Sequence, residues 1–170
     1  RAPKSEVEYA YANYGLGYAR FAEGKMEAAA DAFEEFVQAY STRDGYMYDA
    51  HNRLGDARYT LREFAKARKA YNVVLSSTSS GRDYARYQLA MVDGIERKTK
   101  SKIERLKSIV EDGKGDYVDD AWYELGRTYM AEERYKEGAQ ALRDFTNTDT
   151  GSPYYISALS DLGLAYYNIN

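Results

Sequence analysis

The chain of 170 residues has no cysteine and a single histidine, His51. These absences exclude disulfides, thiolate nucleophiles and cysteine-ligated zinc, and they exclude a metal motif that needs two histidines from this chain. The chain also has only two prolines and 13 glycines, which is too few for a fold built from many strands and tight turns. No segment reaches the roughly 18 consecutive apolar residues of a membrane-spanning helix, so no membrane span is predicted.

A large excess of one charge is lacking as well. The chain has 24 Lys and Arg against 27 Asp and Glu, which gives a formal net charge of −3. Because a surface for a polyanion needs a basic excess, nucleic acid is not an expected partner. The most basic segment, 97–107, follows Glu96 and contains Glu104. It is interpreted as a solvated turn and helix face, with a docking patch for an acidic partner as the alternative.

A Leu-Gly or Leu-Ala pair recurs along the chain at nearly constant spacing. Its five copies end at Gly17, Gly55, Ala90, Gly126 and Gly163, at intervals of 38, 35, 36 and 37 residues. Sixteen residues after each of the first four copies stands a large apolar residue: Phe33, Tyr71, Leu106 and Leu142. The variation in length therefore lies between the units, as is typical of rigid helix–turn–helix units joined by tolerant surface loops.

The segments between the expected loops have helical periodicity. Apolar residues recur at three- and four-residue steps, for example in 29–37 and 118–125. Turn-forming residues separate the periodic segments at 41–45, 76–81, 112–115 and 147–153. In the last of these, Ser152 and Pro153 have the order of a helix N-cap and a first helical residue. The sequence therefore predicts an all-α fold of about nine helices.

The repeat resembles the tetratricopeptide repeat family. Segment 122–129 matches the pattern W-x-x-L-G-x-x-Y of its first helix completely, and 162–166 matches most of it. The resemblance implies an α-solenoid of stacked antiparallel helix pairs. The expected repeats are 10–41, 48–78, 83–112 and 119–148, followed at 153–170 by the first helix of a fifth repeat or a cap.

Some positions depart from the family pattern. The proline near each repeat end is replaced by Ser41, Ser79, Lys114 and Thr150. Lys102 stands where the family has a small residue and two helices touch closely, so a packing conflict is expected in the third repeat. The last helix carries Gly163, which in this register expects a partner helix. We expect either a cap with an exposed apolar face or, preferably, a longer chain, and self-association through this helix.

The resemblance further implies that the first helices of successive repeats line a concave groove. Tyrosine, abundant here at 19 residues, offers a broad apolar face and a hydroxyl with few rotatable bonds, which suits a binding surface. The groove residues assigned in this way are Tyr11, Tyr14, Tyr18, Asn52, Asp56, Tyr59, Tyr84, Tyr87, Tyr123 and Arg127. The alternative is that these rings pack against one another between repeats and leave only their hydroxyls in solvent.

The best-known groove of the family binds a C-terminal carboxylate between Lys, Asn and Arg side chains. The matching positions here include Tyr14, Tyr18, Asn52, Tyr87 and Asp120, without a basic residue. That ligand class is therefore not expected. Specificity is expected instead from the polar groove residues Asn52, Asp56 and Arg127.

No combination of residues predicts catalysis or a metal site. His51 occupies the position that Trp122 has in the fourth repeat, and it is interpreted as a packing residue because no oriented nucleophile accompanies it. Asp116, Asp119 and Asp120 stand at a predicted helix start, where negative side chains complement the helix dipole. Their spacing does not match a calcium loop. We therefore expect no enzymatic activity, no cofactor and no metal.

The function expected from these features is a non-enzymatic interaction scaffold. It would hold a peptide or protein segment in the tyrosine-lined groove, as part of a longer repeat array. A purely structural spacer or assembly element in a cell-envelope complex is the alternative. Long loops with tyrosine-rich helix starts, at 40–48 and 152–155, are similar to those of bacterial cell-envelope tetratricopeptide proteins. This similarity favours a periplasmic or cell-envelope location.

Overall fold

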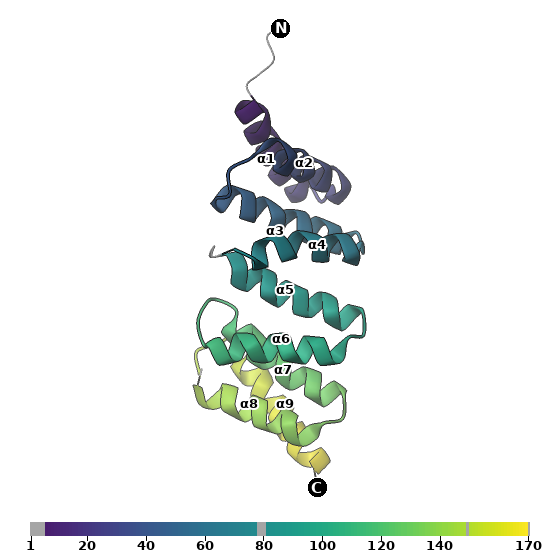
Figure 1. The fold of residues 1–170 in the computed structure, drawn as a ribbon. Helices are drawn as coiled ribbons and strands as arrows, with labels where there is room; N and C mark the ends of the chain where they lie inside the picture. Colours follow the sequence, from purple (N-terminus) through teal and green to yellow (C-terminus); the bar gives the residue numbers. More distant parts are fainter. Residues whose placement is uncertain (1–5, 78–80, 149, 170) are drawn as a thin grey trace. The chain divides into compact units, whose positions relative to one another are not determined.

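The computed structural model describes residues 6–77, 81–148 and 150–169, and all regular secondary structure in these ranges is α-helical (Figure 1). The helices are α1 (Glu6–Ala22), α2 (Met26–Ala39), α3 (Gly45–Thr60), α4 (Phe64–Leu75), α5 (Gly81–Ile95), α6 (Thr99–Asp112), α7 (Val118–Ala131), α8 (Tyr135–Thr148) and α9 (Tyr155–Ile169). The predicted all-α helical-repeat class is confirmed. Ser79, one of the positions that depart from the family pattern, lies outside the described residues.

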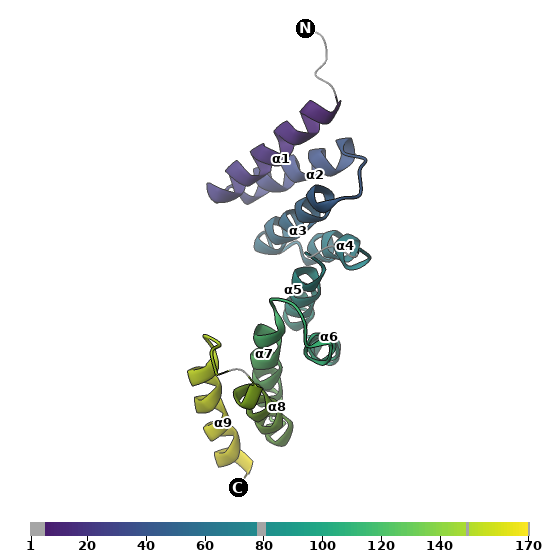
Figure 2. The ribbon, with the colours of Figure 1, turned by 90° about the vertical axis from the view of Figure 1, so that its left-hand side faces the viewer.

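The chain divides into two compact units, Arg1–Gln88 and Leu89–Asn170, and the boundary falls within α5. In the first unit α1 packs on α2, α2 on α3 and α3 on α4. In the second unit α6 packs on α7, α7 on α8 and α8 on α9. Figure 2 shows α1 and α2 lying side by side and running antiparallel in the first unit.

The Leu-Gly register sets the contact within each helix pair. A Cβ added to Gly17 would lie 2.7 Å from the ring of Phe33, and one added to Gly126 would lie 2.6 Å from Cγ of Leu142. Phe33 and Leu142 are completely buried, so neither can move into solvent to make room. Glycine therefore permits the close approach of the paired helices, as the spacing predicts.

The turn between the paired helices has the same backbone conformation in each repeat. One residue takes a left-handed conformation: Gly24 (φ 73°), Arg62 (φ 62°), Arg97 (φ 57°) and Glu133 (φ 57°). Its N–H donates to the carbonyl three residues earlier, and the next N–H donates to the carbonyl five residues earlier. Only the first repeat has glycine here, which adopts this φ without Cβ strain.

Replacing Glu133 with glycine is therefore expected to stabilise the chain by about 0.5–1 kcal/mol. A left-handed φ costs an L-residue about 1–2 kcal/mol, which exceeds the entropy cost of about 0.5–1 kcal/mol that glycine adds. The Glu133 side chain is exposed and makes no interaction within the described residues. Urea unfolding followed by circular dichroism measures the change. Gly24→Ala is the reverse control and should destabilise; a less stable Glu133→Gly variant would contradict the strain.

The packing conflict expected at Lys102 is resolved by an exchange of large and small residues. In the fourth repeat, Met130 on the first helix packs against Gly138 on the second, with its sulfur 3.1 Å from where a Cβ would stand. In the third repeat the equivalent residues are Gly94 and Lys102, and a Cβ on Gly94 would lie 3.1 Å from Lys102 Cδ. The lysine stem thus fills the space over glycine, and its Nζ lies 2.6 Å from Glu124 Oε1.

The last helix differs from the prediction at its start. It begins at Tyr155, two residues after Pro153, because Ser152 Oγ accepts the N–H of Tyr154 in a turn before the helix. A Cβ on Gly163 would meet no described atom within 4 Å, in contrast to Gly17 and Gly126. Apolar side chains of α9 are exposed, among them Leu164, Ile156 and Tyr167. Self-association through this helix stays a prediction.

Candidate binding surface

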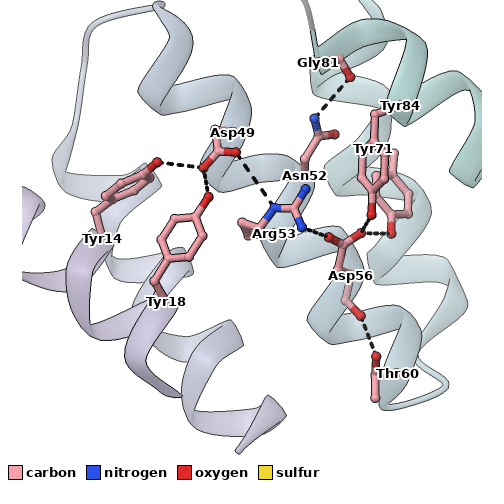
Figure 3. Close-up of polar contacts among 10 residues, drawn as sticks. All are labelled: Tyr14, Tyr18, Asp49, Asn52, Arg53, Asp56, Thr60, Tyr71, Gly81 and Tyr84. Carbon is pink, nitrogen blue, oxygen red and sulfur yellow. Dashed lines mark hydrogen bonds and ion pairs between the residues drawn. The ribbon is translucent and has the colours of Figure 1, made fainter. Parts of the chain in front are cut away.

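Two tyrosines of α1 are held by one carboxylate of α3. The Tyr14 hydroxyl donates to Asp49 Oδ2 at 2.7 Å, and the Tyr18 hydroxyl donates to the same oxygen (Figure 3). Burial and the hydrogen bond to Asp49 raise the pKa of Tyr14 far above its ordinary value, and they raise the pKa of Tyr18 as well. Both hydroxyls therefore stay protonated donors, and they tie the first helices of the first two repeats together.

The rings in this part of the chain form a connected cluster. The Tyr46 ring centre lies 5.3 Å from that of Tyr11 and 5.5 Å from that of Tyr14, in edge-on contacts. Tyr14 also packs on Phe36, which is completely buried. The ring centre of Tyr14 lies 5.1 Å from that of Tyr18. Nevertheless Tyr11, Tyr18 and Tyr46 expose 41%, 39% and 48% of their surface. We call Tyr11, Tyr14, Tyr18 and Tyr46 the tyrosine surface.

A second cluster is centred on Asp56, further along α3. Its carboxylate accepts the hydroxyls of Tyr71 at 2.7 Å and Tyr84 at 2.6 Å, and Arg53 Nη1 lies 2.7 Å from its other oxygen. Arg53 Nε also lies 3.8 Å from Asp49, so one guanidinium joins the two clusters (Figure 3). Burial raises the pKa of Asp56 despite these donors. The three donors, Tyr71, Tyr84 and Arg53, therefore stabilise the ionised form of Asp56 against the cost of its burial.

Asn52 lies between the two clusters but is only 3% exposed. Its Nδ2 donates to the carbonyl of Gly81 at 3.1 Å, which joins α3 to the start of α5 within the first unit. Its Oδ1 is buried and has no hydrogen-bond partner among the described atoms. Tyr14 and Asn52 occupy the same position of their repeats, three residues before the glycine of the Leu-Gly pair. Tyr14 borders the surface, whereas the buried Asn52 supports a contact between helices.

The second unit carries its own cluster between α7 and the start of α9. Tyr123 stacks on Tyr154 with ring centres 5.1 Å apart, and the Arg127 guanidinium carbon lies 5.7 Å from the centre of the Tyr123 ring. The Tyr154 hydroxyl donates to Asp120 at 2.7 Å, and this bond raises the pKa of Tyr154 to about 12. Asp120 aligns with Asp49 in the repeat, so the same carboxylate position accepts a tyrosine hydroxyl in both units.

The remaining predicted groove residues, Tyr59 and Tyr87, are half-buried. The Tyr59 ring packs edge-on against Phe64 in its own repeat, with ring centres 5.7 Å apart. Sequence reasoning missed Arg53, although its spacing of three and four residues from Asp56 and Asp49 is the usual spacing of helical ion pairs. It also treated Tyr71 as core alone. The ring is completely buried, but its hydroxyl reaches the Asp56 carboxylate.

Two carboxylates at the start of α7 bind the segment that precedes α9. Asp119 and Asp120 lie in the first turn of this helix and accept hydrogen bonds from Ser152 and Tyr154.

Within the described ranges, no group of three or more His, Asp or Glu side chains is arranged to hold a metal ion. No helix in the same ranges is long and apolar enough to cross a membrane. The arrangement offers aromatic rings, carboxylates and guanidinium groups for binding.

Two segments match sequence models of the tetratricopeptide repeat, residues 1–44 and 119–149. The first contains the pair α1 and α2, and the second contains α7 and α8. The chain therefore contains tetratricopeptide repeats. Repeats of this family serve as protein-interaction scaffolds. A search of curated proteins gives no match.

Solved structures with the same fold include several repeat proteins. A MamA structure has a TM-score of 0.76 at 18% identity and matches 96% of this chain and 84% of its own. A tetratricopeptide repeat protein from Parabacteroides merdae scores 0.78 at 13% identity, over 95% of this chain and 61% of its own. YrrB, described as having an unusual peptide-binding site, scores 0.69 at 20% identity, over 89% and 74%. These similarities show a shared fold.

Proposed function

We propose that the chain is a non-enzymatic scaffold that binds a peptide or protein segment through the tyrosines of its first helices. The tyrosine surface of the first unit is the principal contact in this proposal, with Tyr84 and Tyr87 further along the same unit. Tyr123 and Arg127 of the second unit provide a separate contact. The proposal is carried by one observation, that tyrosine rings of the first unit are exposed and fixed at the same time.

Exposure combined with fixation favours binding. Tyr18 is 39% exposed while its hydroxyl is bound to Asp49, and Tyr11 is 41% exposed with its hydroxyl 3.3 Å from that of Tyr40. A ring that is already fixed loses little rotamer freedom when a partner covers it, which avoids an ordering cost of about 0.5–1.5 kcal/mol per side chain. Tyrosine combines this rigidity with a large contact area.

The charges beside the tyrosine surface favour a partner with apolar and basic character. Asp49 exposes 36% of its side chain, whereas Asp56 exposes 11%. The two carboxylates share the single guanidinium of Arg53. One of their two negative charges is therefore not neutralised by Arg53. Aliphatic side chains on the rings and a Lys or Arg near Asp49 would complement this surface. At micromolar affinity, the binding free energy would be about −8 kcal/mol.

A structural spacer is the alternative function, and the same hydrogen bonds give it a rationale. Tyr14 to Asp49 joins α1 to α3, and Tyr84 to Asp56 joins α5 to α3. If stabilising the helix stack is the only role of these tyrosines, removing exposed rings would change stability and leave binding unaffected.

Removal of two exposed rings separates the two functions. Peptides selected from a random display library on the wild-type chain serve as the probe, and titration calorimetry measures their affinity. The double variant Tyr18→Ala and Tyr46→Ala is expected to weaken the selected peptides at least tenfold, because losing contact rings of this kind costs more than about 1 kcal/mol each. Tyr167→Ala, on α9 and 80% exposed, is the matched control and should bind like the parent.

The thermal melt of the double variant, followed by circular dichroism, verifies that its helices remain folded. Unchanged peptide affinity in a folded double variant would refute the proposal. Failure of the wild-type chain to select any peptide would favour the structural spacer.

A further inference from the structure

A trough runs along the first unit between α2 and α4, with α3 as its floor. It consists of two adjoining cavities of about 520 and 410 Å³. Both are lined by Val37, His51, Lys69 and Val73, and none of the four residues of the tyrosine surface lines either one. Cavities of this size accommodate several side chains of a bound segment.

The larger cavity is lined by two cations and by no carboxylate. Arg43 lies in the loop before α3 and Lys69 lies on α4; the other lining side chains are apolar or neutral. Neither cation makes a hydrogen bond or an ion pair within the part of the chain that the structure describes. Arg58 and Lys66, which line the smaller cavity, differ because both pair with Glu63. Arg43 and Lys69 therefore keep their charge available to a ligand.

The second unit has an equivalent trough with the opposite charge. Its cavity of about 280 Å³ lies between α6 and α8, over α7. Five lining positions of the first unit have an aligned residue, 71 positions later, in the lining of the second. His51, Arg58, Lys66, Lys69 and Val73 correspond in this order to Trp122, Tyr129, Glu137, Gln140 and Asp144. The lining in the second unit has three carboxylates and one lysine, Lys107. The same arrangement of helices thus occurs with a basic lining in the first unit and an acidic lining in the second. The basic side chains of the first unit are therefore not required by helix packing.

His51 lies on the floor where the two cavities of the first unit meet. Its Nδ1 is buried and has no hydrogen-bond partner among the described atoms. A buried polar atom without a partner is unfavourable, and a ligand carboxylate that accepts a hydrogen bond from the Nδ1–H would supply the missing partner. The equivalent Trp122 has no ionisable group, so the histidine distinguishes this trough from its counterpart.

We propose that the trough of the first unit binds the side-chain carboxylates of an acidic protein segment, with Arg43 and Lys69 as counter-charges and His51 at the floor. A glutamate side chain fits both parts of this lining. Its methylene groups can contact Val37, Met47 and Val73, while its carboxylate receives charge-assisted hydrogen bonds. The trough is a second interaction site that does not depend on the tyrosine surface.

An amidated, fluorescein-labelled hexaglutamate peptide tests the site by fluorescence anisotropy at low salt. The double variant Arg43→Ala and Lys69→Ala is expected to bind it at least tenfold more weakly than the parent chain. Lys107→Ala, which removes one cation from the equivalent trough, should bind within twofold of the parent. A labelled hexaglutamine peptide should not bind, and a hexa-alanine peptide with a free C-terminus tests whether a terminal carboxylate is sufficient.

The single histidine provides a second readout, because its imidazole resonance is the only one of its kind in the proton NMR spectrum. Burial lowers the pKa of His51 in the free chain. The charged groups lining the trough are Arg43, Arg58, Lys66, Lys69 and Glu34, together with the neutral phenol of Tyr48. A bound carboxylate stabilises imidazolium, so hexaglutamate should raise the His51 pKa.

The two readouts decide the proposal jointly. Loss of hexaglutamate binding in the Arg43 and Lys69 double variant, together with the peptide-dependent rise of the His51 pKa, supports it. Equal loss of binding in Lys107→Ala would overturn it, because attraction to any surface cation would then suffice. An unchanged His51 pKa at saturating peptide, or binding of the alanine peptide as strong as that of hexaglutamate, would overturn it as well.

Discussion

Gly55→Ala is expected to destabilise the first unit by about 2–3 kcal/mol, although alanine is the better helix former. A Cβ at this position would lie 2.7 Å from Cδ1 and Cζ of Tyr71. Tyr71 is completely buried, and its hydroxyl is bound to Asp56, so its ring cannot move without breaking that bond. The added methyl therefore forces α3 and α4 apart. Urea unfolding followed by circular dichroism measures the loss.

Gly15→Ala is the matched control for this substitution. Gly15 lies inside α1, and a Cβ there would meet no described atom beyond the backbone of its own helix within 4 Å. The same methyl is therefore expected to stabilise the chain by about 0.5–1 kcal/mol through helix propensity alone. Equal effects of Gly55→Ala and Gly15→Ala would contradict the close packing that the repeat register implies.

Asp56→Ala is expected to cost about 3–5 kcal/mol, because it leaves buried partners without their acceptor. The hydroxyl of the completely buried Tyr71 loses its hydrogen bond, Tyr84 loses its bond to α3, and Arg53 loses its nearer carboxylate. The cost should appear as a lower urea midpoint, with helix content at zero denaturant close to that of the parent.

Asp49→Ala provides the comparison, because Asp49 also accepts two tyrosine hydroxyls and lies on the same helix. Its side chain is 36% exposed, against 11% for Asp56. Water can replace the lost acceptor at an exposed site, so we expect a loss of about 1 kcal/mol or less. A larger effect at Asp49 than at Asp56 would contradict the view that burial determines the strength of these contacts.

The pairing of helices could be predicted from the sequence because it depends on local spacing. Gly126 and Leu142 are 16 residues apart on consecutive helices, and a turn of fixed length brings them together. The exchange at Gly94 and Lys102 follows the same rule, but neither position predicts it alone, because the small residue that accommodates the lysine lies on the other helix of the pair. The start of α9 was placed too early because Ser152 forms a turn that precedes the helix.

The polar contacts of the candidate site were harder to predict. Asp56 receives Tyr71 from α4 and Tyr84 from α5, and the meeting of these side chains depends on the packing angles of three helices. Tyr14 and Asn52 occupy the same repeat position, and the sequence predicts that both line the groove. In the structure Tyr14 is half-buried, whereas Asn52 is buried. The basic trough was likewise hidden, because its lining comes from α2, α3, α4 and the loop that contains Arg43.

The proton–nitrogen correlation NMR spectrum of the chain, recorded with and without a library-selected peptide, tests the central claim most directly. The proposed function predicts chemical-shift changes concentrated in α1 and in the first half of α3, around Tyr11, Tyr18 and Tyr46. In the Tyr18→Ala and Tyr46→Ala double variant these changes should disappear while the rest of the spectrum is retained. Changes confined to other helices, or changes that persist in the double variant, would contradict binding at the tyrosine surface.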